Sequence, residues 1–226
     1  MAQESSIGKI VHSESHVRYT CQVFSQGEVA TPPEPTDYAF SNFVRVPLRH
    51  SPDLLSGQQA GDLSHWAIGL IYDTILVNPA FGTFGPRLSN DAQVELFSPD
   101  YLSERAVLVS ILLLGTMALS KTGTATSVSH GIPALALELG AEVSRLDDTA
   151  LRAFHHFADH GAPGSSHRPY LHMGYLPHAL TIDHSLLPLA MLRTIERLER
   201  LFPENEALLS IVKRNFAWKM KVETAG

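Results

Sequence analysis

Residues 67–77 form an almost unbroken run of apolar and β-branched side chains, and this run constrains the fold more than any other stretch. Gly69 lies inside the run, and Asn78 and Pro79 end it. An apolar segment of this length that ends at Asn-Pro is more typical of a buried strand than of a helix. The sequence therefore predicts a long central strand here, followed by a tight loop at residues 78–90.

Earlier segments also carry strand patterns. Residues 16–24 alternate between apolar and polar side chains, which is the period of a half-buried strand. The apolar members of this alternation are Val17, Tyr19, Cys21 and Val23. Residues 42–48 alternate again and end at Pro47, and residues 7–11 form a short apolar start. The first 115 residues are therefore expected to be rich in β-structure.

The strongly apolar segment 103–114 is harder to assign, because its pattern alone does not separate a buried strand from a buried helix. Ser103, followed by Glu104 and Arg105, is typical of a helix start, so we favour a helix. Residues 116–130 are rich in Ser, Thr and Gly, which predicts a loop or linker.

After residue 130 the apolar spacing becomes helical, and Asp147 is a candidate helix cap. The residues with this spacing are Leu135, Leu139, Val143 and Leu146, then Leu187, Met191, Ile195, Leu198 and Phe202, and finally Leu208, Ile211, Val212 and Phe216. The predicted fold class is α+β. A β-rich domain at residues 1–115 is followed by a linker at 116–130 and an α-helical C-terminal domain at 131–226.

The composition is that of an ordinary globular protein. A formal charge of −6 gives no general attraction to phosphate backbones, so direct nucleic-acid binding is disfavoured. The single cysteine, Cys21, excludes an internal disulfide, and its place on an apolar strand face favours a buried, inert thiol. We find no apolar signal segment at the N-terminus and no apolar run long enough to span a bilayer, so we expect a cytoplasmic protein.

One stretch approaches a nucleotide-binding motif. Residues 115–122 match the pattern G-x-x-x-x-G-K-[ST] except that Ser120 replaces the second glycine. A phosphate-binding loop needs that glycine and must open a helix, whereas the residues after Thr122 are a poor helix start. A working phosphate site is therefore not expected.

The chain has twelve histidines, and most of them fall in its C-terminal half. His156 and His160 have the i, i+4 spacing that would put two imidazoles on one helix face, where they could bind Zn²⁺ or Fe²⁺. Position 157 is Phe, so the general base of an HExxH motif is absent. Structural or surface histidines are the favoured interpretation, and a metal-dependent enzyme that uses this histidine cluster stays as the alternative.

Two segments are candidates for partner binding. The C-terminal segment is a basic cluster with interleaved aromatic residues, which can dock a partner or lie as a solvated helix face. Its candidate contact residues are Lys213, Arg214, Trp218 and Lys219. The loop at residues 78–89 is compact and partly apolar, as a rigid docking loop would be. Its candidate contact residues are Asn78, Phe81, Phe84 and Arg87.

The first third of the chain resembles the HAS-barrel family, the small β-barrel shared by HerA-type DNA translocases and rotary ATP synthase subunits. The resemblance rests on IGKIV at residues 7–11 with SES at 13–15, on NFVRV at 42–46, and on AIGLIYD at 67–73. It implies that residues 1–115 form a small β-barrel. In this family the barrel is an assembly element on a hexameric ring, and the nuclease NurA docks there in HerA-type systems. Motor members continue into a P-loop ATPase core, which this chain lacks.

These features together predict a non-catalytic accessory or adaptor protein that acts without a cofactor. The resemblance implies docking on a multi-subunit assembly such as a HerA–NurA-like machine for DNA end processing and repair. The expected partners are therefore proteins, and self-association into a homo-oligomer is compatible with the sequence.

Overall fold

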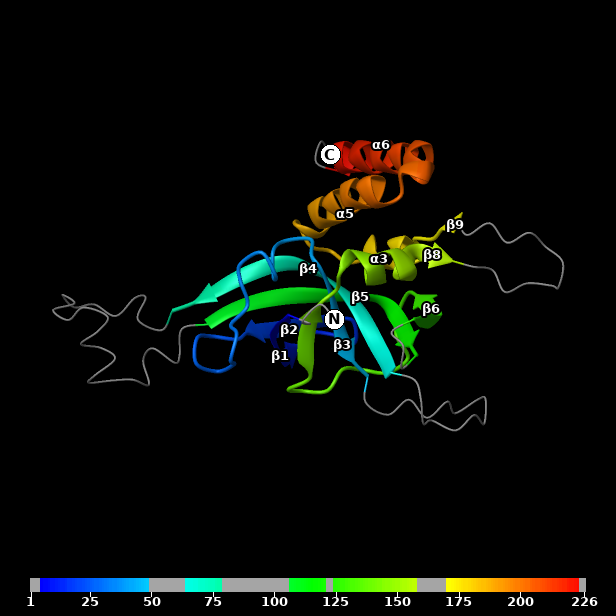
Figure 1. Cartoon of the computed structure of the whole chain (residues 1–226). Coiled ribbons are helices and arrows are strands. Elements are labelled where there is room, and N and C mark those ends of the chain that lie inside the picture. The colour runs from blue at the N-terminus through cyan, green and yellow to red at the C-terminus, as the bar shows by residue number, and fades with distance from the viewer. Residues whose placement is uncertain (1–4, 49–63, 79–105, 121–123, 158–169, 224–226) are drawn as a thin grey trace.

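The computed structural model of the chain describes residues 5–48, 64–78, 106–120, 124–157 and 170–223, and its fold is α+β (Figure 1). A closed six-stranded antiparallel β-barrel forms one part, and the helices lie on one side of it, with α6 farthest from the barrel. The helices are α3 (Asp148–His155), α4 (Leu176–Ala179), α5 (Leu187–Leu201) and α6 (Glu206–Glu223), with a short 3₁₀ helix η1 (Pro203–Asn205) before α6.

Six strands follow one another around the barrel in the order β2-β1-β7-β3-β4-β5, and pairing between β2 and β5 closes it. Their bounds are β1 (Ser6–Ser13), β2 (Arg18–Val23), β3 (Phe43–Pro47), β4 (Ser64–Val77), β5 (Ala106–Leu119) and β7 (Glu142–Arg145). β6 (Ala125–His130) extends the sheet beside β5, and β8 (His156–Phe157) pairs with β9 (Tyr170–Leu171) in a separate small sheet. Because the six-stranded ring closes on itself, it leaves no edge along most of its length.

The strands predicted from alternation are confirmed. The expected strand at residues 67–77 is β4, which begins slightly earlier, at Ser64. The expected strand at residues 16–24 is β2, and its predicted apolar face, which includes Cys21, is buried. Residues 7–11 lie within β1, and residues 42–48 contain β3.

Several barrel strands are buried on both faces, which explains their continuous apolar runs. Residues 67–72 of β4 are all buried. In β3 even Arg45 is only 8% exposed, and its guanidinium carbon lies 4.5 Å from the centre of the Trp66 ring. A guanidinium stacked on an aromatic face keeps a favourable electrostatic contact inside the packed structure.

The helix predicted at residues 103–114 is wrong for the part that the structure describes. Ala106–Leu119 is strand β5, which pairs with β4, with β2 through residues 108–112, and with β6. Helix α4 lies over β5, and the His178 Nε2 atom donates to the Leu113 carbonyl at 3.0 Å. Because β5 is covered on its inner and outer faces, its apolar residues do not alternate, and the pattern resembles that of a buried helix.

The linker predicted at residues 116–130 is also wrong where it is described. Residues 116–119 complete β5, and residues 125–130 form β6. The strand β6 is short and only half-buried, so its Ser- and Thr-rich composition is typical of a loop as much as of a strand.

The helical spacing at Leu135, Leu139, Val143 and Leu146 does not correspond to a helix. Residues 142–145 are strand β7, which lies between β1 and β3 in the barrel. Leu135 and Leu139 are exposed in the preceding loop, so the spacing is coincidental. The barrel is therefore not confined to residues 1–115, because one of its six strands comes from the segment predicted to be helical.

The other predicted helices are present. Asp147 caps α3, and its side chain accepts a hydrogen bond from the Ala150 amide at 2.7 Å. The predicted stripe on α5, from Leu187 to Phe202, is buried. The face predicted for α6 is partly wrong, because Leu209 and Phe216 are buried while Leu208 and Ile211 are exposed.

Candidate functional site

Four titratable side chains pack together among the described residues, and we define them as the histidine cluster: His130, His155, His172 and Tyr175. The rings of His130 and His172 stack with their centres 4.6 Å apart. His155 is fully buried, and its Nε2 atom lies 2.8 Å from the Tyr175 hydroxyl, which is buried as well. The cluster joins the end of β6 to α3 and to the segment before α4.

The hydrogen bonds around these rings define neutral imidazoles. The Gly174 amide donates to His130 Nδ1 at 3.0 Å, so His130 carries its proton on Nε2 and donates to the Phe154 carbonyl at 2.9 Å. His155 donates from Nδ1 to the Leu151 carbonyl at 2.9 Å and accepts from Tyr175. Burial lowers the pKa of His130 to about 4 and that of His155 to about 3.

The described histidines that make hydrogen bonds to backbone carbonyls have structural roles. His130 and His155 each donate a hydrogen bond to a backbone carbonyl of α3, and His178 donates one to a backbone carbonyl of β5. His16 lies 2.7 Å from the Pro133 carbonyl and connects the start of β2 to the loop before β7. Buried carbonyls at irregular points of a fold need such partners, which explains much of the unusual histidine content.

The geometry assumed for the alternative metal site is not present at His156. Helix α3 ends at His155, and His156 has an extended backbone and begins β8. His156 therefore does not share a helix face with position 160, and His160 itself lies outside the described residues. Within the described ranges, no three His, Cys, Asp or Glu side chains come together as a metal would require.

The phosphate-like motif and Cys21, the two other candidate sites, also have structural roles. Residues 115–119 of the phosphate-like motif are paired strand, and a Cβ on Gly115 would lie 2.2 Å from the Ser129 carbonyl oxygen. No phosphate-binding loop can form from backbone that is already paired on both sides. Cys21 is buried, and burial raises the pKa of its thiol to about 12, as expected of an inert cysteine.

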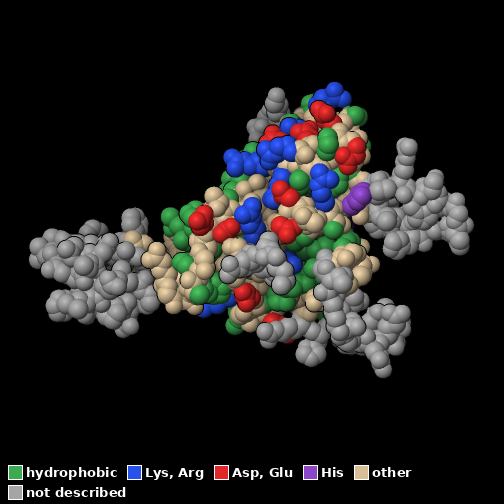
Figure 2. Space-filling view, viewed as in Figure 1, with side chains coloured by type: hydrophobic (Ala, Val, Ile, Leu, Met, Phe, Trp, Pro, Cys, Tyr) green, Lys and Arg blue, Asp and Glu red, His purple; other side chains and the backbone are tan. Residues whose placement is uncertain are grey.

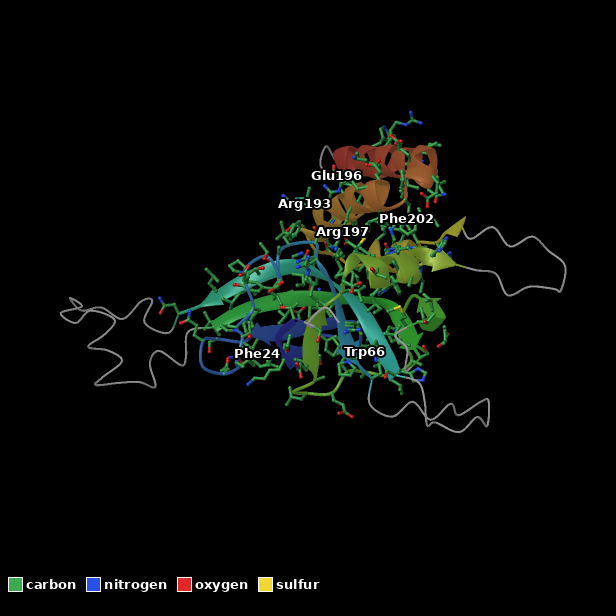
Figure 3. The ribbon with its side chains drawn as sticks, viewed as in Figure 1. Phe24, Trp66, Arg193, Glu196, Arg197 and Phe202 are labelled. Atoms are coloured by element: carbon green, nitrogen blue, oxygen red, sulfur yellow. The ribbon has the colours of Figure 1, made fainter. Side chains whose placement is uncertain are left out.

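One end of the barrel carries a groove of about 470 Å³ that is lined by both apolar and uncharged polar groups. It lies where β2 and β4 end and β5 begins, and Phe24 stands beside this end of the barrel (Figure 3). None of the lining residues is charged. They are Gln22, Val23, Phe24, Ser25, Pro33, Tyr38, Leu76, Val77, Asn78, Ala106 and Val107. Hydrophobic side chains gather at this end of the molecule (Figure 2).

The end of β4 beside this groove is exposed, and no strand of the described part of the chain pairs with one of its two edges. β3 pairs with β4 only over residues 66–70 of β4, whereas β5 pairs with it as far as Val77. Among the described strands, none lies on the other side of β4 residues 73–77. Leu76 is 75% exposed and Ile75 is 50% exposed. We call this end of β4, together with the groove, the barrel-end surface.

The structure places the predicted partner-binding residues in two separate regions. Asn78 is exposed and lines the groove, whereas Phe81, Phe84 and Arg87 lie outside the described residues. Lys213 forms ion pairs within the chain, because its Nζ atom lies 3.0 Å from Glu199 and 3.3 Å from Glu196 of α5. Figure 3 shows Glu196 on α5 with Arg193 and Arg197.

On α6 itself, Arg214 is exposed and Trp218 is 68% exposed. Nothing is described of the Lys219 side chain. Arg214 and Trp218 share their exposed surface with Leu208 and Ile211, and partner binding through α6 stays a prediction.

Most of the barrel-end surface was not found from the sequence. Its members come from β2, from the loop before β3, from β4 and from β5, so only the barrel closure brings them together. The available signal was the length of the apolar run at residues 67–77, which continues beyond the part of β4 that the barrel buries.

The fold and these surfaces define an α+β protein built on a closed β-barrel, with an exposed apolar end. The family model described as "Domain of unknown function (DUF8166)" matches residues 1–225, so the chain belongs to this family. A comparison with curated proteins gives no match. In the described part of the chain, no helix has the length and apolarity that a membrane-spanning helix needs.

Proposed function

We propose that this protein is a non-catalytic accessory protein that docks onto a protein partner through the barrel-end surface. The observation that supports this most is the exposure of Ile75, Leu76 and Val77 at the end of a strand that is otherwise buried. Contiguous apolar exposure on a folded chain is typical of an interaction site. The structural roles of the described histidines leave the adaptor interpretation favoured over the metal enzyme.

The occupant that fits this surface is an extended apolar segment of the partner. Such a segment can pair with the open edge of β4 and place alternate side chains into the groove, as in β-strand addition. Backbone hydrogen bonds would satisfy the unpaired edge groups, and the groove would select side chains. The uncharged lining of the groove favours apolar or small polar side chains over charged ones.

A display library of random dodecamer peptides tests this proposal without a known partner. We expect selection on the full-length protein to enrich peptides with alternating β-branched or aromatic residues. The substitution Leu76→Asp should weaken binding of an enriched peptide at least about tenfold, because a buried unpaired carboxylate opposes apolar contact. Binding is measured by fluorescence anisotropy of the labelled peptide.

Leu139→Asp is the matched control, because Leu139 is 79% exposed and lies in the loop before β7, away from the groove. It should leave peptide binding unchanged. Both variants should keep the wild-type melting temperature, since both side chains are largely exposed. Failure to enrich any peptide, or equal losses from the two variants, would overturn the proposed site.

The more specific proposal is that the partner belongs to a multi-subunit assembly, such as a HerA–NurA-like DNA-processing machine in the cytoplasm. Its support is the resemblance of residues 5–80 to HAS barrels, together with the compatible closed six-stranded barrel. In this proposal the barrel is the docking element, and the helices carry a second surface.

A further inference from the structure

The outer face of α6 carries an apolar stripe with no partner among the described residues. Leu208 and Ile211 are each 49% exposed, and Trp218 is exposed still more. The opposite face of the helix, with Leu209 and Phe216, packs on α5. α6 is the outermost element of the molecule, on the far side of α5 from the barrel (Figure 1).

The spacing of the stripe is that of a helix-pairing seam. Leu208, Ile211, Asn215 and Trp218 follow one another at intervals of three, four and three residues, which are the a and d positions of a heptad repeat. Four residues in this register lie on one side of the helix, and all four are exposed. The single polar member of the stripe is Asn215.

Acidic residues precede the basic ones along η1 and most of α6. Glu206 begins α6, Glu204 lies just before it in η1, and both are exposed. Lys213 and Arg214 lie at its middle, and Lys219 and Lys221 lie near its end, before the last residue, Glu223. Two such helices side by side in parallel would bring like charges together, whereas an antiparallel pair brings each acidic end to a basic end.

We propose that α6 pairs in antiparallel fashion with α6 of a second copy of this chain, and so forms a two-fold symmetric dimer. In this arrangement Trp218 of one copy lies opposite Leu208 of the other, and Ile211 lies opposite Asn215. The twofold symmetry makes one stripe complementary to itself. In the antiparallel orientation the two helix dipoles also point in opposite directions, which is the favourable arrangement.

A pair of single helices buries less than the standard interface of about 1,600 Å². The dimer is therefore expected to be reversible, with a dissociation constant on the order of 10 µM. This interface is separate from the barrel-end surface, so the two proposals can fail independently.

Sedimentation velocity over a range of protein concentrations tests the dimer. We expect wild-type protein to pass from monomer to dimer, and Ile211→Asp to weaken association at least about tenfold. Leu139→Asp is again the matched control and should associate like the wild type. A wild-type protein that stays monomeric up to about 200 µM, well above the expected constant, would overturn the proposal.

Charge reversal tests the orientation. In an antiparallel pair, the double variant E204K/E206K places basic ends against basic ends and should weaken the dimer, while adding K219E/K221E should restore it. In a parallel pair, like charges meet at both ends of the helices in the wild type and in the double variant alike. The double variant would then not weaken the dimer, and adding K219E/K221E would restore nothing. Dimerisation without rescue would contradict the antiparallel arrangement.

Discussion

Lowering the pH from 7 to 5 is expected to reduce the free energy of unfolding by about 4 kcal/mol through two buried histidines alone. His130 and His155 are neutral in the folded protein, with pKa values of about 4 and about 3 against 6.5 for an unperturbed histidine. At pH 5 each ring is protonated in the unfolded chain and remains neutral in the folded one. Each therefore contributes a loss of about 2 kcal/mol.

The direction follows from burial and from the neighbouring charges. Burial is the main cause of both lowered pKa values. The charged groups that act on His155 are His130, His172 and Arg197, and all three oppose its protonation. Stability from these rings is fully present above about pH 7. It is lost as the pH falls through 6.5 toward the folded pKa values, because the unfolded chain binds the protons first.

Urea denaturation at pH 7, 6 and 5 measures the effect. His130→Gln and His155→Gln should each reduce the pH dependence by about half, whatever they do to stability at pH 7. His12→Gln, at an exposed position, is the control and should leave the pH dependence unchanged. If either buried variant does not fold, NMR of the wild-type imidazoles replaces it. Two rings should keep their neutral chemical shifts at pH 5, and their titration near pH 6.5 would contradict the prediction.

Gly115→Ala is expected to lower the free energy of unfolding by about 3 kcal/mol. Gly115 lies in β5 opposite Ile68 of β4 and His130 of β6. A Cβ there would meet the Ser129 carbonyl oxygen at 2.2 Å and the His130 Cα at 3.1 Å. Both neighbours are backbone atoms of β6, so the strand itself must move, and the contacts of His130 with Phe154 and Gly174 must move with it.

Gly174→Ala is the matched control for this substitution. Its Cβ would also come close to a neighbour, the His172 Nε2 atom at 2.5 Å, but that atom belongs to a side chain that is only half-buried. Rotation of the ring should limit the loss to about 1 kcal/mol. Thermal or urea unfolding of both variants measures the difference. A loss for Gly115→Ala no greater than that for Gly174→Ala would contradict the close pairing of β5 and β6.

The strands with one exposed and one buried face could be predicted from the sequence. β2 shows this best. Its residues Tyr19, Cys21 and Val23 are buried, while the residues between them, Thr20 and Gln22, are less so. The long β4 was also recognisable, since Asn78 and Pro79 mark its end and its length is unusual for an apolar strand. On α5 the helical stripe coincides with the buried face.

The sequence failed where burial or length removes periodicity. β5 is covered on both faces, so its residues from Val109 to Gly115 are buried without a break and show no period of two. β7 has only four residues, and long-range pairing with β1 and β3 decides its conformation. The composition of β6 is that of a loop, and its pairing with β5 is likewise a long-range property.

The candidate sites show the same limit. The neutrality of His130 and His155 depends on their burial. Their proton positions depend on the carbonyl groups of Phe154 and Leu151, which no spacing rule connects to histidines. Asn78 was the only groove residue proposed from the sequence, because the groove requires the ends of β2, β4 and β5 to meet. Trp218 could be recognised from the sequence as a candidate contact residue, since it is an aromatic residue within a basic cluster.

Site-specific photo-cross-linking at Leu76 in the native host tests the proposed docking function most directly. Benzoylphenylalanine replaces Leu76 in one variant and the equally exposed Leu139 in the other. We predict one principal cross-linked protein at position 76, with the attachment mapped by mass spectrometry to an extended apolar segment, and none of it at position 139. A translocase or nuclease subunit would support the more specific proposal. No cross-link at position 76, or the same proteins at both positions, would contradict docking through the barrel-end surface.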